Sequence, residues 1–169
     1  MYTQMLNNII KSRIYLGVDP GTHRVGYGVV KAENGKFSLI EQGIIKTKQG
    51  GSSIEQLPLI YKKISSLIKK NSPDEVAIEK LFFSKNQKTA MAVAEARGVI
   101  LLAAAEKSVK IREFMPNTVK QSISGYGFAD KKAMLKIVTM MLGLKNFKPI
   151  DDASDALAIA ITAALIKDN

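Results

Sequence analysis

The sequence predicts an α/β domain with a mixed sheet of five strands flanked by helices, and three observations support this fold class. Three strand-like segments come first, at 14–19, 26–33 and 37–47. Helical patterns then alternate with two further short strands, at 76–79 and 109–114. A run of strands followed by alternating helices and strands is typical of a layered α/β domain.

The first strand organises the rest of the chain. Residues 14–19 are almost continuously apolar, which predicts a strand buried on both faces. It delivers Asp19 into a turn made by Pro20 and Gly21, so this carboxylate is expected at an end of the sheet. The second and third strands meet at Asn34-Gly35, a strong hairpin signal that makes the opening of the fold antiparallel.

The helical patterns fall at 53–71, 87–107, 117–124, 130–142 and from 151 onward. In the first helix Ser53 is a plausible N-cap, although Pro58 is an alternative start. In the second helix small residues recur at Ala90, Ala94 and Gly98 and allow close approach of another element, either the sheet or a second copy of the chain. The last helix is apolar nearly all round from Ala156 and should be buried.

Composition narrows the function. Lys and Arg total 25 against 15 acidic residues, a formal net charge of +10, which favours a polyanionic partner such as nucleic acid. The chain has no cysteine, which excludes disulfides, a thiolate nucleophile and Cys-type zinc sites, and a cytoplasmic location is expected. No apolar run is long enough to span a membrane. We expect residues 1–13 to be an N-terminal extension and 14–169 a single domain.

Four acidic residues are candidates for one site. Asp19 and Glu79 end predicted strands, while Asp152 and Asp155 lie three apart at the start of the last helix, where acids also stabilise the helix dipole and cap free amides. Carboxylates that converge repel one another unless a cation neutralises them, and oxygen ligands without cysteine favour Mg²⁺ or Mn²⁺. On a basic protein this predicts two-metal phosphodiester hydrolysis. His23 is a possible general base, although a lone loop histidine is more often a bystander.

Several motifs in order identify a family. They are Gly-Val-Asp-Pro-Gly-Thr-His-Arg-Val-Gly-Tyr-Gly from Gly17, Ala-Ile-Glu-Lys-Leu-Phe-Phe-Ser-Lys-Asn from Ala77, Ala-Arg-Gly ending at Gly98, Val-Lys-Gln from Val119, and Asp-Ala-Ser-Asp-Ala-Leu-Ala-Ile-Ala from Asp152. Together they resemble the bacterial RuvC-type Holliday junction resolvases over about residues 14–165. The resemblance implies a ribonuclease-H-like fold, a homodimer and a branch-migration helicase complex as partner. It also implies paired nicks in like-polarity strands of four-way junction DNA.

The resemblance also assigns roles to individual residues. The positions that match the family's metal ligands, for two Mg²⁺ or Mn²⁺ ions per active site, are Asp19, Glu79, Asp152 and Asp155. Lys120 and Lys131 match positions where the family places catalytic or DNA-contacting lysines, with solvated surface lysines as the alternative. Lys85 is a further candidate for DNA contact. Phe82 matches an aromatic that stacks on unpaired bases, with Phe83 expected in the core.

Three other functions compete with junction cleavage: RNA processing, ATP-dependent chemistry and junction binding without catalysis. A related ribonuclease-H-like enzyme that trims ribosomal RNA precursors also opens with an Asp-x-Gly turn, but the Phe-Phe segment and the late Asp-x-x-Asp argue against it. An actin-like ATPase or sugar kinase needs a second Gly-rich phosphate loop and about twice the length. A junction-binding protein without catalysis would have no need of all four acids.

Overall fold

The computed structural model describes residues 12–48, 50–81, 87–145 and 151–166. The strands are β1 (Arg13–Asp19), β2 (Arg24–Glu33), β3 (Lys36–Lys46), β4 (Glu75–Glu79) and β5 (Lys110–Phe114). The helices are α2 (Ser53–Asn71), α3 (Gln87–Glu106), α4 (Pro116–Ser124), α5 (Lys131–Met141) and α6 (Asp151–Leu165). These elements agree in kind and order with the sequence prediction, and the boundaries differ by one or two residues.

The five strands form one mixed sheet in the order β3-β2-β1-β4-β5. The β1–β2 and β2–β3 pairs are antiparallel, whereas β1–β4 and β4–β5 are parallel. The hairpin between β2 and β3 turns at Asn34 and Gly35, which both have positive φ (53° and 73°), as a tight two-residue turn requires. The predicted fold class, an α/β ribonuclease-H-like domain with a mixed five-stranded sheet, is therefore confirmed.

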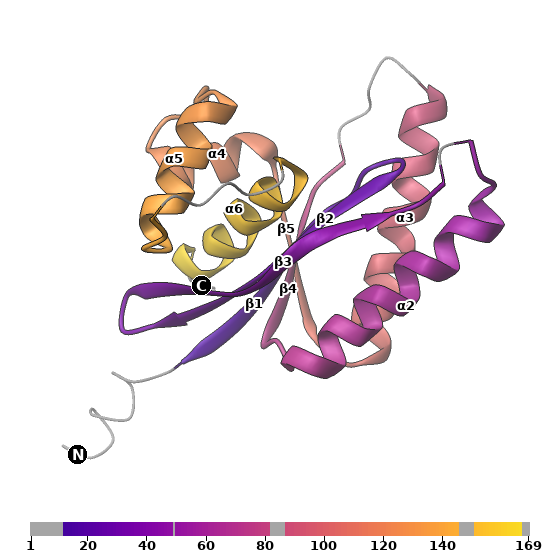
Figure 1. Ribbon diagram of the computed structural model, residues 1–169, viewed down its shortest axis with the longest axis horizontal. Coiled ribbons are helices and arrows are strands. Elements are labelled where there is room, and N and C mark those ends of the chain that lie inside the picture. Colours follow the sequence, from indigo (N-terminus) through magenta and orange to yellow (C-terminus); the bar gives the residue numbers. More distant parts are fainter. Residues whose placement is uncertain (1–11, 49, 82–86, 146–150, 167–169) are drawn as a thin grey trace.

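Helices cover both faces of the sheet (Figure 1): α2 and α3 lie on one side, and α4, α5 and α6 on the other. Each face has its own hydrophobic core, because side chains alternate along each strand. Leu16 and Val76 pack under α2 and α3, while Tyr15 and Ala77 pack under α6. The last helix is buried as expected, since every residue from Ala156 to Ala163 is buried.

Two details of the helices correct the sequence prediction. The N-cap position of α2 is Ser52 rather than Ser53, although its side chain makes no capping hydrogen bond, and Pro58 lies inside the helix rather than at its start. A proline removes only one helical hydrogen bond, and the turn before the helix is fixed because the Gln56 amide donates to the carbonyls of Lys48 (3.0 Å) and Gly51 (2.7 Å). The helix therefore begins ahead of its proline.

The small residues of α3 do not all pack on the sheet. The helix meets the sheet through buried Ala96, Ile100 and Ala103, whereas Ala94 and Gly98 are exposed. A Cβ added at Gly98 would have nothing within 4 Å. Packing on the sheet is therefore the wrong explanation for Ala94 and Gly98.

Candidate active site

Asp19 and Glu79 end neighbouring strands on the face that α6 covers. Gly17 and Ala77 pair in the parallel register of β1 and β4, and both face α6. Asp19 and Glu79 each follow two residues later, so strand alternation returns them to the same face. The two carboxylates thus lie level with each other on strands about 4.8 Å apart.

Glycines bring α6 directly onto these strand ends. Gly26 pairs with Asp19 in the register of β1 and β2, and a Cβ at Gly26 would collide with the carbonyl oxygen of Asp152. A Cβ at Gly17 would collide in the same way with the carbonyl of Ala156. Only glycine permits such a close approach of a helix backbone to a strand. The first turn of α6, which carries Asp152 and Asp155, is therefore held over the end of β1.

The pKa values of Asp19 and Glu79 are raised. Burial, the largest cause, acts together with the charges of Glu79, Asp155 and Asp152, in that order, to raise the pKa of Asp19 from its ordinary 3.8 to about 7. The charge of Lys131 opposes this rise. Burial also raises the pKa of Glu79, and Asp155 adds to it, whereas Lys120 and Lys131 lower it. Asp19 therefore interacts electrostatically with the other three candidate acids, and the roles of all four stay predictions.

Two cations of the chain partly neutralise this cluster. The Arg24 Nε lies 2.6 Å from Asp152 Oδ2, and the Lys131 Nζ lies 3.3 Å from Asp155 Oδ2. Within the described residues, no group of three or more His, Cys, Asp or Glu side chains is arranged to hold a metal ion. In this conformation the carboxylates of α6 are turned towards basic side chains rather than towards a common centre.

A cleft of about 250 Å³ opens beside the acids. Residues from β4, α4, α5 and α6 line it, and they include Glu79, Lys120, Lys131 and Asp155. Two lysines and two acids thus line the same cavity. A phosphate group that entered the cleft would meet both kinds of charge.

The remaining predicted site residues divide into two groups. Phe82, Phe83 and Lys85 lie outside the described residues. His23 is half-buried beside the turn after β1, and its Nδ1 is buried with no hydrogen-bond partner. Its backbone carbonyl accepts from the Thr47 amide at 3.0 Å. Its possible role as a general base stays a prediction.

Sequence reasoning missed Arg24 and the packing role of the glycines. The pairing of Arg24 with Asp152 joins positions more than a hundred residues apart, so it has no local signal in the sequence. The glycines did have a sequence signal. Gly17 on β1 and Gly26 and Gly28 on β2 lie on one face of the sheet, where they leave room for a helix.

The sheet is mixed and five-stranded, carboxylates end two neighbouring strands, and lysines line the cleft beside them. This combination defines a nuclease of the ribonuclease-H-like class. The family model described as "Crossover junction endodeoxyribonuclease RuvC" matches residues 15–163, and the chain belongs to this family.

Curated relatives carry the same description. The chain is 48% identical over 145 residues to the protein of Thermosipho melanesiensis, covering 86% of this chain and 92% of the relative. It is 44% identical over 147 residues to that of Fusobacterium nucleatum, covering 87% and 77%. Both are described as crossover junction endodeoxyribonuclease RuvC.

Solved structures agree with the family. The structure of Thermus thermophilus RuvC in complex with a Holliday junction substrate matches with a TM-score of 0.86 and 32% identity, covering 90% of this chain and 93% of that one. The yeast mitochondrial Holliday junction resolvase Ydc2 matches with a TM-score of 0.62 at 14% identity, over 88% of this chain and 77% of the other, and shows the fold alone.

Proposed function

We propose that this protein is a structure-selective endonuclease that cuts four-way DNA junctions by paired, metal-dependent nicks in strands of like polarity. The observation that carries the proposal is that Asp19 lies close enough to Glu79, Asp155 and Asp152 for their charges to raise its pKa, beside a cleft lined by Lys120 and Lys131. Membership of the RuvC family and the likeness to a RuvC–junction complex support this substrate over ribosomal RNA precursors and over binding without cleavage.

The four carboxylates fit divalent cations. Their donor atoms are all oxygens, and a bound cation would offset the burial and carboxylate repulsion that raise the pKa of Asp19. We assign these four residues as ligands of two Mg²⁺ or Mn²⁺ ions, which when bound lower the pKa of the attacking water and stabilise the leaving 3′ oxygen. Asp152 would exchange Arg24 for a metal ion, and Asp155 would exchange Lys131.

The lysines supply the remaining charge. Lys120 lines the cleft beside Glu79 and can donate to a non-bridging phosphate oxygen, whose negative charge grows as the phosphodiester is attacked. Lys131, once released from Asp155, can hold a neighbouring phosphate. The arrangement needs no protein nucleophile, because water attacks.

The proposed DNA substrate is also the reason to expect a cytoplasmic location. No helix in the described ranges is long and apolar enough to cross a membrane.

We further propose that the active form is a homodimer joined through α3. The exposed face of this helix carries a stripe with Met91 (66% exposed), Ala94, Gly98 and Leu102 (52% exposed) at near-helical spacing. Two copies related by a twofold axis would offer two cuts to a junction of matching symmetry. Replacing Leu102 with Glu should shift the protein to monomer in sedimentation experiments and abolish paired cutting. A branch-migration helicase partner stays a prediction from the family resemblance.

The experiment that tests the function is a cleavage time course on a synthetic mobile four-way junction. The protein and its Asp19→Asn variant are compared in Mg²⁺, Mn²⁺ and EDTA, with a linear duplex and an RNA hairpin as other substrates. Symmetric, ligatable nicks that vanish in EDTA and in the variant, while junction binding persists, are expected.

Glu33→Gln is the matched control, because it neutralises a carboxylate that only pairs with Lys31 on the surface (2.9 Å) and should cut normally. Tight junction binding without a metal-dependent cut, across several junction sequences, would overturn the proposal.

A further inference from the structure

Two aromatic rings are exposed together on the connection between α4 and α5. Tyr126 is 63% exposed and Phe128 is 78% exposed. Their ring centroids lie 5.6 Å apart, with an angle of 59° between the ring planes. Single exposed apolar side chains are common, but an adjacent pair of rings facing water indicates a surface that binds something.

The connection is held in place by hydrogen bonds, so the rings are presented by a fixed support. Helix α4 ends at Gly125, whose φ is 73°, and the amide of Gly125 donates to the Gln121 carbonyl. The Ser124 hydroxyl accepts from the Tyr126 amide (3.1 Å) and lies 2.7 Å from the Lys120 carbonyl. The Ala129 amide donates to the Tyr126 carbonyl at 3.3 Å, and Ala129 itself is buried.

The segment that carries the rings is basic. Residues 116–145 contain five lysines and a single acid, Asp130. That acid is committed to the fold, since its carboxylate accepts the Ala133 amide at 2.7 Å and caps α5. A surface of this composition attracts a polyanion and offers little to a basic protein.

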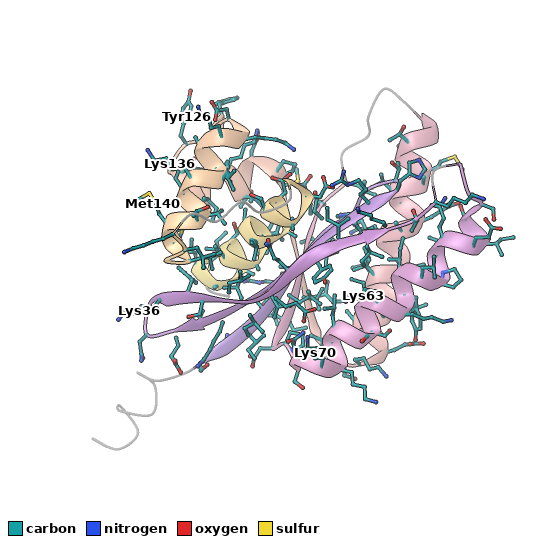
Figure 2. All side chains as sticks on the ribbon, viewed as in Figure 1. Lys36, Lys63, Lys70, Tyr126, Lys136 and Met140 are labelled. Atoms are coloured by element: carbon teal, nitrogen blue, oxygen red, sulfur yellow. The ribbon has the colours of Figure 1, made fainter. Side chains whose placement is uncertain are left out.

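The exposed lysines follow one face of α5. Lys132, Lys136 and Met140 are all exposed and recur every four residues. Figure 2 shows Lys136 and Met140 on the outer side of the α4–α5 pair and Tyr126 at its upper end. In this view Tyr126, Lys136 and Met140 follow one outer edge of the α4–α5 pair.

This surface adjoins the cleft. Lys131 lines the cleft and follows Phe128 by three residues, which span at most about 11 Å even when fully extended. At 3.4 Å per base step, that distance is about three nucleotides along a DNA strand. A strand whose phosphate lies in the cleft therefore reaches the rings within a few bases.

We propose that Tyr126 and Phe128 form a base-stacking site for an unpaired nucleobase about three steps from the cut, while Lys132 and Lys136 contact phosphates of the same strand. This inference rests on the proposed function and adds a substrate-binding surface to it. An aromatic ring accepts any base, so the site would help to hold an opened junction without adding sequence preference.

The test measures junction binding and the local state of the base. Junctions carry 2-aminopurine at each of the five positions either side of the cut, and Ca²⁺ replaces Mg²⁺ so that cleavage does not intervene. The double variant Tyr126→Ala/Phe128→Ala is expected to bind the junction at least ten-fold more weakly and to lose a fluorescence change confined to two or three of these positions. The ring-preserving variant Tyr126→Phe should retain both.

Charge is tested separately. Lys132→Gln/Lys136→Gln should reduce the slope of log affinity against log salt by about two, because each phosphate contact contributes about one. Ile54→Ala is the matched control, since it truncates an exposed apolar residue (86%) of α2 on the other side of the sheet.

The outcomes separate this inference from the proposed function. If the unmodified protein cuts junctions and the double alanine variant binds them as tightly as the control, the stacking site is refuted and the function stands. The same result would follow if the rings docked a partner protein. If the unmodified protein neither binds nor cuts junctions, the proposed function fails, and the inference fails with it.

Discussion

Replacing Asp19 with Asn should stabilise the metal-free protein while it abolishes cleavage. Asp19 is surrounded by Glu79, Asp155 and Asp152, and burial together with this repulsion raises its pKa from 3.8 to about 7. One pKa unit corresponds to about 1.4 kcal/mol, so holding Asp19 ionised costs the folded state about 4 kcal/mol. An asparagine removes the charge but keeps a polar amide that is itself costly to bury, so the expected net gain is about 2 kcal/mol.

The sign of the pH dependence follows from linkage. Between pH 4 and pH 7 the folded state binds a proton at Asp19 that the unfolded state has lost, so the stability of the unmodified protein falls as pH rises through this window. Above about pH 7 Asp19 is ionised in both the folded and the unfolded state, so its contribution to the pH dependence of stability ends there. The Asp19→Asn variant lacks this group, so its advantage should be near zero at pH 4 and greatest at pH 8.

Urea unfolding in EDTA, followed by circular dichroism at pH 4, 5, 6, 7 and 8, measures this difference. Glu33→Gln should show no comparable gain, because the exposed Lys31–Glu33 pair contributes little. Adding Mg²⁺ at pH 8 should reverse the order, since only the unmodified protein gains strongly from metal binding. An Asp19→Asn variant no more stable than the unmodified protein at pH 8, or an advantage that is equal at pH 4 and pH 8, would refute the reasoning.

Three further variants test the site. Lys120→Ala should slow single-turnover cleavage by about 10²- to 10³-fold, while junction affinity changes only a few-fold; an equal loss in both would show that Lys120 only binds DNA. Arg24→Ala removes a half-exposed competitor for Asp152, so half-maximal cleavage should need about two- to five-fold less Mg²⁺; a higher requirement would contradict the competition. Gly26→Ala should cost more than about 2 kcal/mol of stability in thermal unfolding and abolish cleavage, because its Cβ would collide with the Asp152 carbonyl; a tolerated Gly26→Ala would contradict the close packing of α6.

The fold could be predicted because its signals are local. The apolar strand ending at Asp19 and the Asn34-Gly35 turn each specify their own geometry, and the nearly all-apolar last helix has no alternative to burial. The start of α2 could not be fixed in this way. Its position depends on the Gln56 amide holding the preceding turn, a contact that competes with the signal of Pro58.

The site was predictable in its carboxylates but not in their partners. Asp19 and Glu79 could be placed because both end strands, and Asp152 and Asp155 because they begin a helix that must pack on the sheet. The Arg24–Asp152 pair depends on where α6 meets β2, which is decided by tertiary packing. The exposed side of α3 was likewise ambiguous, because small residues suit a sheet contact and a helix contact equally well.

The packing of α6 against β1 and β2 has a consequence for synthesis on the ribosome. The proposed metal ligands come from a strand near the start of the chain and from the last helix described, so the proposed metal centre would have to wait for α6. Until that helix emerges, the glycine-bearing face of the sheet stays uncovered. On the proposed assignment a nascent chain would not nick DNA, and a prematurely terminated product would be inert as a nuclease and prone to aggregate.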